Sequence, residues 1–169
     1  SGRQVALLFI DLDDFKALND SLGHDMGDLL LQQVAQRLPS CVREGDTVAR
    51  LGVDEFVVML EDLNENVQEA ATQTETVGGK ILATLNQPYL LAGHESHITP
   101  SIGATLFGNH QNSIDELLKQ ADLAMYQAKA AGRKQYCLFS TSMSDQATER
   151  FQMETALREA TAAGGWRSF

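Results

Sequence analysis

The sequence contains little cysteine and no long apolar segment. Only two of its 169 residues are cysteines, Cys41 and Cys137, and neither belongs to a Cys-x-x-Cys pair. Two cysteines are too few for a disulfide framework, so we expect free thiols and a reducing compartment, the cytoplasm. The longest apolar run near the N-terminus covers residues 5–10, whereas a membrane-spanning helix needs about 20 apolar residues. A signal-peptide pattern is also missing.

Basic residues are scarce as well: the sequence has 13 Lys and Arg but 23 Asp and Glu, so its formal charge is −10. A protein that binds duplex DNA needs a basic face, so this charge argues against a duplex nucleic acid as partner. It does not exclude a nucleotide, because a few local cations and a metal ion can hold a triphosphate. The length suits one domain, and a chain of this size buries about 70% of its surface on folding.

Apolar patterns divide the first 140 residues into strands and helices. The continuous run at 5–10 predicts a strand that is buried on both faces. Asp25 and Asp28 are candidate caps of the second helix, and Gly78-Gly79 weakens the helical pattern of the third. The mixture of elements predicts an α/β (α+β) fold with a mixed, largely antiparallel central sheet flanked by helices. The expected further strands are 47–51, 57–60, 88–91, 98–107 and 136–139, and the expected helices are 17–22, 29–38, 67–86 and 113–131.

Two of the predicted strands carry acids at one end. The stretch Arg-Leu-Gly-Val-Asp-Glu-Phe at 50–56 predicts a β-hairpin with a two-residue turn at Gly52-Val53, followed directly by Asp54 and Glu55. The strand at 5–10 also runs into an acid, Asp11. If these strands are neighbours, Asp11 and Asp54 converge, and paired carboxylates suit Mg²⁺, which prefers oxygen ligands. The spacing leaves two alternatives open: a solvated hairpin tip, and aspartates after the first strand that cap the next helix.

A phosphate site also needs positive charge. Lys16 follows the first acids by about one helical turn, while Lys129 and Arg133 are four residues apart and share one helix face. Cations near a helix C-terminus are favourable without any ligand, so that alternative also remains open. The segment Gly78-Gly79-Lys80 lacks the spacing and the preceding strand of a Walker motif.

Other catalytic or metal-binding patterns are weak. His94 and His97 have an His-x-x-His spacing without acidic or cysteine partners, so a zinc site is not favoured there. His24 lies in a glycine-rich turn, where a structural role is expected. There is no Gly-x-Ser-x-Gly and no Cys/His pairing typical of a covalent nucleophile.

Three separated segments resemble the GGDEF-domain family, the diguanylate cyclases. They are FIDLDDFKALNDSLGHDMGD at 9–28, RLGVDEF at 50–56 and ADLAMYQAKAAGR at 121–133, and the resemblance covers about residues 5–139. It implies a sheet similar to the palm of nucleotide cyclases and polymerases. It also implies a reaction in which two GTP molecules form cyclic di-GMP and release two pyrophosphates.

The resemblance extends to individual residues. It implies metal ligation by Asp11, Asp54 and the carbonyl of Leu12, with Mg²⁺ (or Mn²⁺) as the ion, and it implies that Glu55 assists in activating the ribose 3′-hydroxyl. For GTP it implies that the guanine base is read by Asn19 and Asp28 and that the phosphates are contacted by Lys16, Lys129 and Arg133. The motif turn, Gly52 and Val53, is implied to lie against the same nucleotide.

A second ligand site and several partners are implied in the same way. Arg43 and Asp46 resemble the RxxD inhibitory site of the family, where an arginine fork and an acid would hold cyclic di-GMP. Catalysis implies a homodimer with two-fold symmetry, because each domain holds one GTP. The expected division is a GGDEF domain at 1–140, a connector helix at 141–160 toward an EAL domain, and a tail at 161–169. We also expect an upstream sensor domain.

The chain departs from the family pattern at one position, where Val53 replaces the second glycine of the motif. We expect a type II′ turn, in which Gly52 supplies the positive φ that a β-branched residue resists. The extra carbons of Val53 are expected to crowd GTP, because the family's glycine lets the backbone approach the ribose and α-phosphate. Two hypotheses follow: an active or slowed cyclase, and an impaired domain that binds GTP or cyclic di-GMP and regulates a neighbouring EAL domain.

Overall fold

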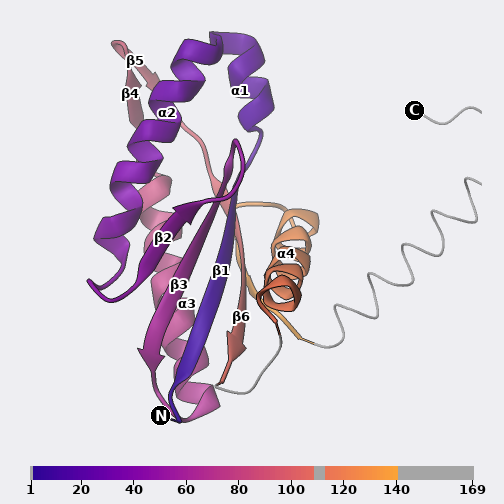
Figure 1. Cartoon of the computed structure of the whole chain (residues 1–169). Coiled ribbons are helices and arrows are strands. Elements are labelled where there is room, and N and C mark those ends of the chain that lie inside the picture. The colour runs from indigo at the N-terminus through magenta and orange to yellow at the C-terminus, as the bar shows by residue number, and fades with distance from the viewer. Residues whose placement is uncertain (1, 109–112, 141–169) are drawn as a thin grey trace, which may run out of the picture. The chain divides into compact units, whose positions relative to one another are not determined.

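The computed structural model describes residues 2–108 and 113–140, which fold around a five-stranded sheet (Figure 1). The predicted connector at 141–160 and the tail at 161–169 lie outside the described residues. In the part of the chain that is described, no helix combines the length and the apolar character that crossing a membrane requires.

The sheet has the order β2-β3-β1-β6-β7, with β1 at its centre. β1 runs antiparallel to both β3 and β6, β2 is antiparallel to β3, and β7 is parallel to β6. The predicted mixed, largely antiparallel sheet is therefore confirmed. The five strands are β1 (Gln4–Leu12), β2 (Thr47–Arg50), β3 (Glu55–Leu63), β6 (Pro100–Phe107) and β7 (Tyr136–Leu138).

Helices cover both faces of this sheet (Figure 1). Successive β1 side chains point to opposite faces, so Leu8 and Ile10 join the larger core with α2 and α3, while Leu7 and Phe9 pack against α4. The strand predicted to be buried on both faces is thus confirmed. The described helices are α1 (Phe15–Leu22), α2 (His24–Arg37), the short 3₁₀ helix η1 (Leu38–Cys41), α3 (Val67–Leu85) and α4 (Ile114–Ala130).

A separate two-stranded hairpin, β4 (Tyr89–Leu91) with β5 (His94–Ser96), is anchored to α2. The Arg37 guanidinium lies 3.8 Å from the centre of the Tyr89 ring and donates hydrogen bonds to the carbonyls of Thr84, Gln87 and Pro88. This arginine ties α2 to the end of α3 through a cation–π contact and three carbonyls.

Two glycines allow close packing that a larger residue would block. A Cβ on Gly103 of β6 would lie 2.0 Å from the Met125 amide nitrogen and 2.2 Å from the Ala121 carbonyl, so α4 approaches the sheet through this position. A Cβ on Gly78 would lie 2.4 Å from the Tyr136 ring. α3 is therefore continuous through Gly78-Gly79, and the weakness expected there is outweighed by tertiary packing.

Two local expectations are wrong. Neither Asp25 nor Asp28 caps α2, because the helix starts earlier, with Gly23 as its N-cap residue and no side-chain hydrogen bond there. Asp14 precedes α1 in a left-handed conformation (φ 57°) and its side chain does not cap that helix either. Gly23 alone separates the two helices, as the C-cap residue of the short α1 and the N-cap residue of α2. By contrast, a side chain does cap α4, since the Ser113 hydroxyl accepts from the Glu116 amide.

Candidate functional site

The acids of the two predicted strand ends meet at one edge of the sheet. Asp11 of β1 is the register partner of Glu55 of β3, and the Leu12 amide donates to the Asp54 carbonyl at 3.1 Å. The amide and the carbonyl of one strand residue point to the same side, so the Leu12 carbonyl also faces Asp54. This edge therefore gathers three carboxylates and one backbone carbonyl from β1 and the start of β3.

The crowding of these carboxylates changes their protonation. Burial raises the pKa of Asp11 from 3.8 to about 6; the nearby Lys129 ammonium opposes this shift, while the charges of Asp54 and Glu55 add to it. Burial also raises the pKa of Glu55, with further contributions from Asp54 and from Asp122 of α4. A negative charge at this edge is therefore unfavourable until a cation compensates it.

Lys129, from the last turn of α4, supplies one such cation. Its ammonium lies 3.3 Å from Asp11 Oδ1 and 3.6 Å from Asp13 Oδ1. The position of α4 against Gly103 places Lys129 beside the end of β1, so a packing feature decides where this charge sits. Lys129 is thus more than a cation that stabilises its own helix terminus.

Asp13 is buried at this edge and was given no site role by sequence reasoning. Its Oδ1 accepts from the Ser101 hydroxyl at 2.6 Å, and its Oδ2 accepts from the Thr99 hydroxyl at 2.7 Å and from the Lys134 amide at 3.1 Å. The capping alternative is wrong for Asp13, because these partners lie on β6, on the segment entering β6 and on the turn after α4. The sequence signal was a further acid two residues after Asp11, directly after the end of β1.

The other two predicted phosphate cations occupy exposed positions. Arg133 is exposed in the turn between α4 and β7, and Lys16 is exposed on α1. Both Arg133 and Lys134 have positive φ, 62° and 51°, which costs a non-glycine residue about 1 kcal/mol or more. The turn that carries Arg133 is thus held in a fixed, unfavourable conformation by its surroundings.

The motif hairpin differs from the expected two-residue turn. β2 ends at Arg50 and β3 starts at Glu55, so four residues connect them, and Gly52 is not among the described residues with positive φ. The Arg50 guanidinium donates to the Gly52 and Val53 carbonyls at 2.9 and 2.8 Å, and the Leu51 amide donates to the Glu55 carbonyl at 2.9 Å. These bonds stabilise a wider loop, so no residue needs the left-handed conformation.

The two motif positions at this tip have different surroundings. A Cβ on Gly52 would lie 2.4 Å from Glu55 Oε1, whereas the Val53 side chain is 63% exposed. A side chain at position 52 would therefore require the Glu55 carboxylate to move. Val53 is accommodated in the folded chain without burial.

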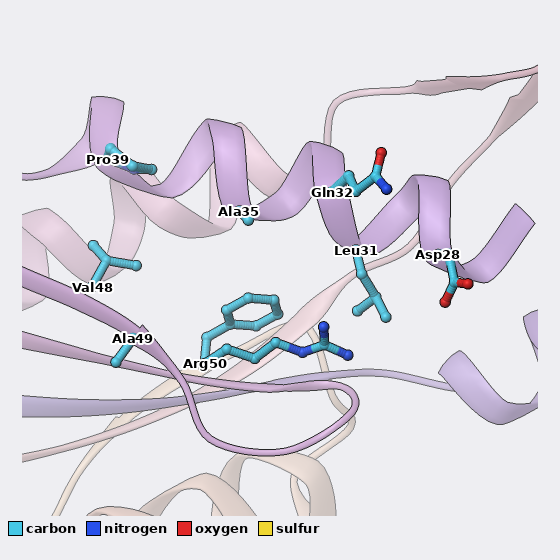
Figure 2. A pocket seen from close by; sticks show the side chains of 9 residues that line it. Asp28, Leu31, Gln32, Ala35, Pro39, Val48, Ala49 and Arg50 are labelled. Carbon is cyan, nitrogen blue, oxygen red and sulfur yellow. The ribbon is translucent and has the colours of Figure 1, made fainter. Parts of the chain in front are cut away.

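A cavity of about 420 Å³ lies between α2 and β2 (Figure 2). Figure 2 shows Leu31 and Gln32 of α2 on one side, with the Arg50 side chain of β2 extending toward the end where Asp28 lies. The cavity has an apolar floor and an acid at one end, which suits a base that carries hydrogen-bond donors. Of the two predicted guanine-reading residues, Asp28 lines this cavity.

Asn19, the other predicted guanine-reading residue, packs against α2. Its Oδ1 is buried without a hydrogen-bond partner among the described residues, and a Cβ on Gly27 would lie 1.8 Å from that atom. An unsatisfied buried amide oxygen is costly, which is typical of a group kept for a ligand or for a rearrangement on binding. Gly27 was not predicted as a site residue, and its role becomes visible only from this contact.

The donor set at the sheet edge fits a divalent metal ion. Asp11, Asp54 and the Leu12 carbonyl offer oxygen atoms, the ligands that Mg²⁺ prefers, and the raised pKa of Asp11 indicates a site that lacks positive charge. Among the described residues, no group of three or more His, Cys, Asp or Glu side chains is arranged to enclose a metal by itself. The protein would thus provide a partial ligand set, leaving positions for substrate oxygens. This result also gives no support to zinc at His94 and His97.

The RxxD turn is built around Asp46. Its Oδ2 accepts from the Arg43 amide at 2.9 Å and its Oδ1 from the Glu61 amide at 3.0 Å, and its side chain is only 3% exposed. The Arg43 side chain is 61% exposed, with Nε 3.6 Å from Asp46 Oδ2. Asp46 therefore fixes the turn, while Arg43 remains accessible to a ligand.

A second cavity, of about 330 Å³, adjoins this turn. Arg43 and Asp46 line one part of it, Lys80 of α3 another, and Leu60 and Val77 supply apolar surface. Two cations beside an apolar wall suit a ligand with both phosphates and rings. Lys80 was considered only for a Walker motif in the sequence, so its place beside Arg43 was missed.

Comparisons with known proteins agree on one family. Residues 1–135 match the family model described as "Diguanylate cyclase, GGDEF domain". The chain is 46% identical over 158 residues to the bifunctional diguanylate cyclase/cyclic di-GMP phosphodiesterase MucR of Pseudomonas aeruginosa. The aligned region covers 94% of this chain and 22% of MucR. It spans less than a quarter of the length of the first curated relatives that it matches.

Solved structures are similar as well. The TpbB (YfiN) structure from Pseudomonas aeruginosa that comprises only the GGDEF domain has a TM-score of 0.79 and 36% identity, covering 86% of this chain and 83% of that one. An EAL/GGDEF domain protein from M. capsulatus has a TM-score of 0.72 and 41% identity, covering 83% of this chain and 87% of that one.

Proposed function

Because this chain belongs to the GGDEF family of cyclic di-GMP signalling domains, we propose that it binds GTP with a divalent metal ion at the β1–β3 edge. One observation carries this proposal. Asp11, Asp54 and Glu55 converge beside Lys129, where β1 ends and β3 begins. The guanine base would occupy the cavity between α2 and β2, with Asp28 accepting from its donors.

The family uses a divalent metal, and we assign Mg²⁺ (or Mn²⁺) to Asp11, Asp54 and the Leu12 carbonyl. When bound, such an ion would supply charge neutralisation for the triphosphate. Lys129, Arg133 and Lys16 would provide further positive charge for the phosphates. The carboxylate crowding described above supports this assignment, since binding of a cation relieves it.

The proposed reaction is the condensation of two GTP molecules to cyclic di-GMP. Each ribose 3′-oxygen forms a bond to the α-phosphorus of the other GTP, and each α-phosphorus loses its bond to the oxygen of the leaving pyrophosphate. The proton of the 3′-hydroxyl would pass to Glu55, because burial and the neighbouring carboxylates raise the pKa of Glu55 and so strengthen it as a base. Two domains must face each other, so we propose that the active form is a two-fold symmetric homodimer.

A second candidate is an impaired domain that binds nucleotide and regulates an EAL neighbour. Val53 favours this alternative, because it places three side-chain carbons at the exposed tip where the family motif has glycine. If the ribose and α-phosphate lie against this tip, binding survives while the attacking hydroxyl is displaced. A displacement of about 1 Å can reduce a rate about 10²-fold.

We further propose that the Arg43/Asp46 turn holds cyclic di-GMP, with Arg43 contacting the ligand, Asp46 fixing the turn and Lys80 as an additional phosphate contact. The accessible guanidinium, the second cation and the apolar wall of the adjoining cavity support this site. Occupation there would inhibit a cyclase by product, or would report cyclic di-GMP in an impaired domain.

The relatives suggest the wider setting. Because MucR is bifunctional, we propose that residues 1–140 act as the GGDEF domain and 141–160 connect it to an EAL domain, with a sensor domain upstream and 161–169 unassigned. The described cysteines are free, and together with the use of GTP this supports a cytoplasmic location.

The deciding experiment incubates the purified domain with GTP and Mg²⁺ and separates the products by chromatography. Formation of cyclic di-GMP by the wild-type domain, but not by an Asp54→Asn control, supports the cyclase. GTP binding without product supports the regulator. Failure to bind either GTP or cyclic di-GMP contradicts both.

A further inference from the structure

The buried Asp13 carboxylate joins the metal-binding strand to the parts that carry the phosphate-binding cations. It sits at the end of β1, two residues after Asp11, and its side chain is 3% exposed. Its oxygens meet two hydroxyl groups, one backbone amide and the Lys129 ammonium. A buried charge with this many partners fixes their relative positions, because moving any of them leaves the carboxylate less well satisfied.

We propose that Asp13 is a positioning residue that aligns Lys129 and Arg133 with the metal-binding edge, so that the phosphates of GTP are bound correctly. This inference rests on the proposed GTP site. Asp13 itself would not contact the phosphates. It would act through its ion pair with Lys129 and through its hydrogen bond to the Lys134 amide.

The first connection is electrostatic. Lys129 lies between two carboxylates, 3.3 Å from Asp11 and 3.6 Å from Asp13. Without the second carboxylate, Lys129 would pair with Asp11 alone and would compete more strongly with a metal ion for that ligand. Asp13 therefore holds the ammonium beside the metal-binding acids and leaves Asp11 available.

The second connection is through the backbone. The Lys134 amide donates to Asp13 Oδ2, and the Arg133 amide donates to the Ala128 carbonyl at 3.0 Å. Arg133 and Lys134 are consecutive residues with positive φ, a conformation that persists only where the surroundings enforce it. Asp13 supplies one of those restraints, so it determines the direction in which Arg133 leaves the turn.

Asp13→Asn tests both connections with little change in volume. An amide has one acceptor oxygen, whereas Oδ1 faces Ser101 and Lys129 and Oδ2 faces Thr99 and Lys134. In either orientation the amide NH₂ group faces the Lys129 ammonium or the Lys134 N–H, neither of which can accept a hydrogen bond. The substitution therefore disturbs at least one connection.

The experiment measures binding of 3′-deoxy-GTP and of GMP by calorimetry in the presence of Mg²⁺. The deoxy analogue lacks the attacking hydroxyl, so condensation does not interfere. We expect Asp13→Asn to bind the triphosphate about tenfold more weakly while GMP affinity changes by less than about twofold. Only the triphosphate uses the full set of positioned cations, whereas a general loss of structure would weaken both ligands.

Thr105→Val is the matched control. Thr105 of β6 is buried and donates to Gln120 of α4 at 2.7 Å, so this variant also removes a buried polar contact between the sheet and α4, away from the acids. It should reduce thermal stability without changing the ratio of triphosphate to GMP affinity. If Asp13→Asn does not fold, Ser101→Ala is the variant that tests the proposal. It keeps the Asp13 carboxylate but removes one of its hydrogen-bond donors. We expect its affinity for the triphosphate to fall about threefold.

Equal losses for both ligands, or none, in the folded variant would overturn the positioning role. An unchanged ratio in Ser101→Ala, where that variant has to decide, would do the same. A wild-type domain that binds neither ligand would contradict the proposed function and this inference with it.

Discussion

Replacing Asp11 by Asn should stabilise the metal-free domain while removing a proposed metal ligand. The Asp11 side chain is 15% exposed, and its pKa is raised from 3.8 to about 6 although Lys129 is only 3.3 Å away. The net environment therefore opposes the ionised carboxylate even with its ion pair intact. An amide of the same size removes that charge and leaves the packing nearly unchanged.

The sign and size of the effect follow from proton linkage. A carboxyl group with a raised pKa in the folded state contributes stability at low pH, which is lost as the pH rises through the interval from 3.8 to about 6. The difference between these two pKa values corresponds to about 3 kcal/mol of stability at pH 7.5 but only about 1 kcal/mol at pH 4.5. Asp11→Asn should thus raise the melting temperature by roughly 6–12 °C at pH 7.5.

The assay is thermal unfolding followed by circular dichroism in EDTA, at pH 7.5 and pH 4.5. Glu44→Gln, at an exposed position in the RxxD turn, serves as the control for loss of one negative charge and should change little. With excess Mg²⁺ and GTP, wild type should be stabilised while Asp11→Asn should not. If the Asp11→Asn gain is absent at pH 7.5, or is the same at both pH values, the electrostatic reasoning is wrong.

Three other substitutions test separate parts of the proposals. Val53→Gly should raise cyclic di-GMP formation from GTP, measured by chromatography, because it removes the carbons at the motif tip; an unchanged or lower rate refutes the steric argument. Arg43→Ala should abolish cyclic di-GMP binding in calorimetry, since the accessible guanidinium is lost while Asp46 still fixes the turn; parent protein without binding would refute the inhibitory site. Gly27→Ala should displace the Asn19 amide and reduce the preference for GTP over ATP about tenfold in competition binding, since a buried donor or acceptor left unpaired costs about 1–3 kcal/mol. A retained preference would show that Asn19 does not read the base.

Much of the fold could be predicted because the sheet repeats simple patterns. The apolar run at 5–10 indicated a strand buried on both faces, and the regular apolar spacing of α4 indicated that helix. The failures are local and have tertiary causes. Gly78 appeared unfavourable for a helix because local propensity takes no account of the Tyr136 ring, which is far away in sequence and fills the space beside this glycine.

The motif hairpin shows the same limit at shorter range. Turn propensities indicated two residues at the turn and a positive φ at Gly52, but the Arg50 side chain bonds two carbonyls of a wider loop. Rules for tight turns consider only the backbone of the turn residues. A preceding side chain that folds back onto the loop lies outside those rules.

The two aspartates at the end of β1 show why a site cannot be read from acid spacing alone. Asp11 lies near the end of β1 and Asp13 directly follows the strand, two residues later, so a sequence pattern treats them alike. Their surroundings separate them, because Asp13 is satisfied by two hydroxyls and a backbone amide, whereas Asp11 has Lys129 and is crowded by Asp54 and Glu55. A carboxylate with enough donors is held in place by the fold; a carboxylate that lacks them retains affinity for an added cation. The ligand and its support can therefore be distinguished only when the hydrogen-bond donors of each oxygen are known.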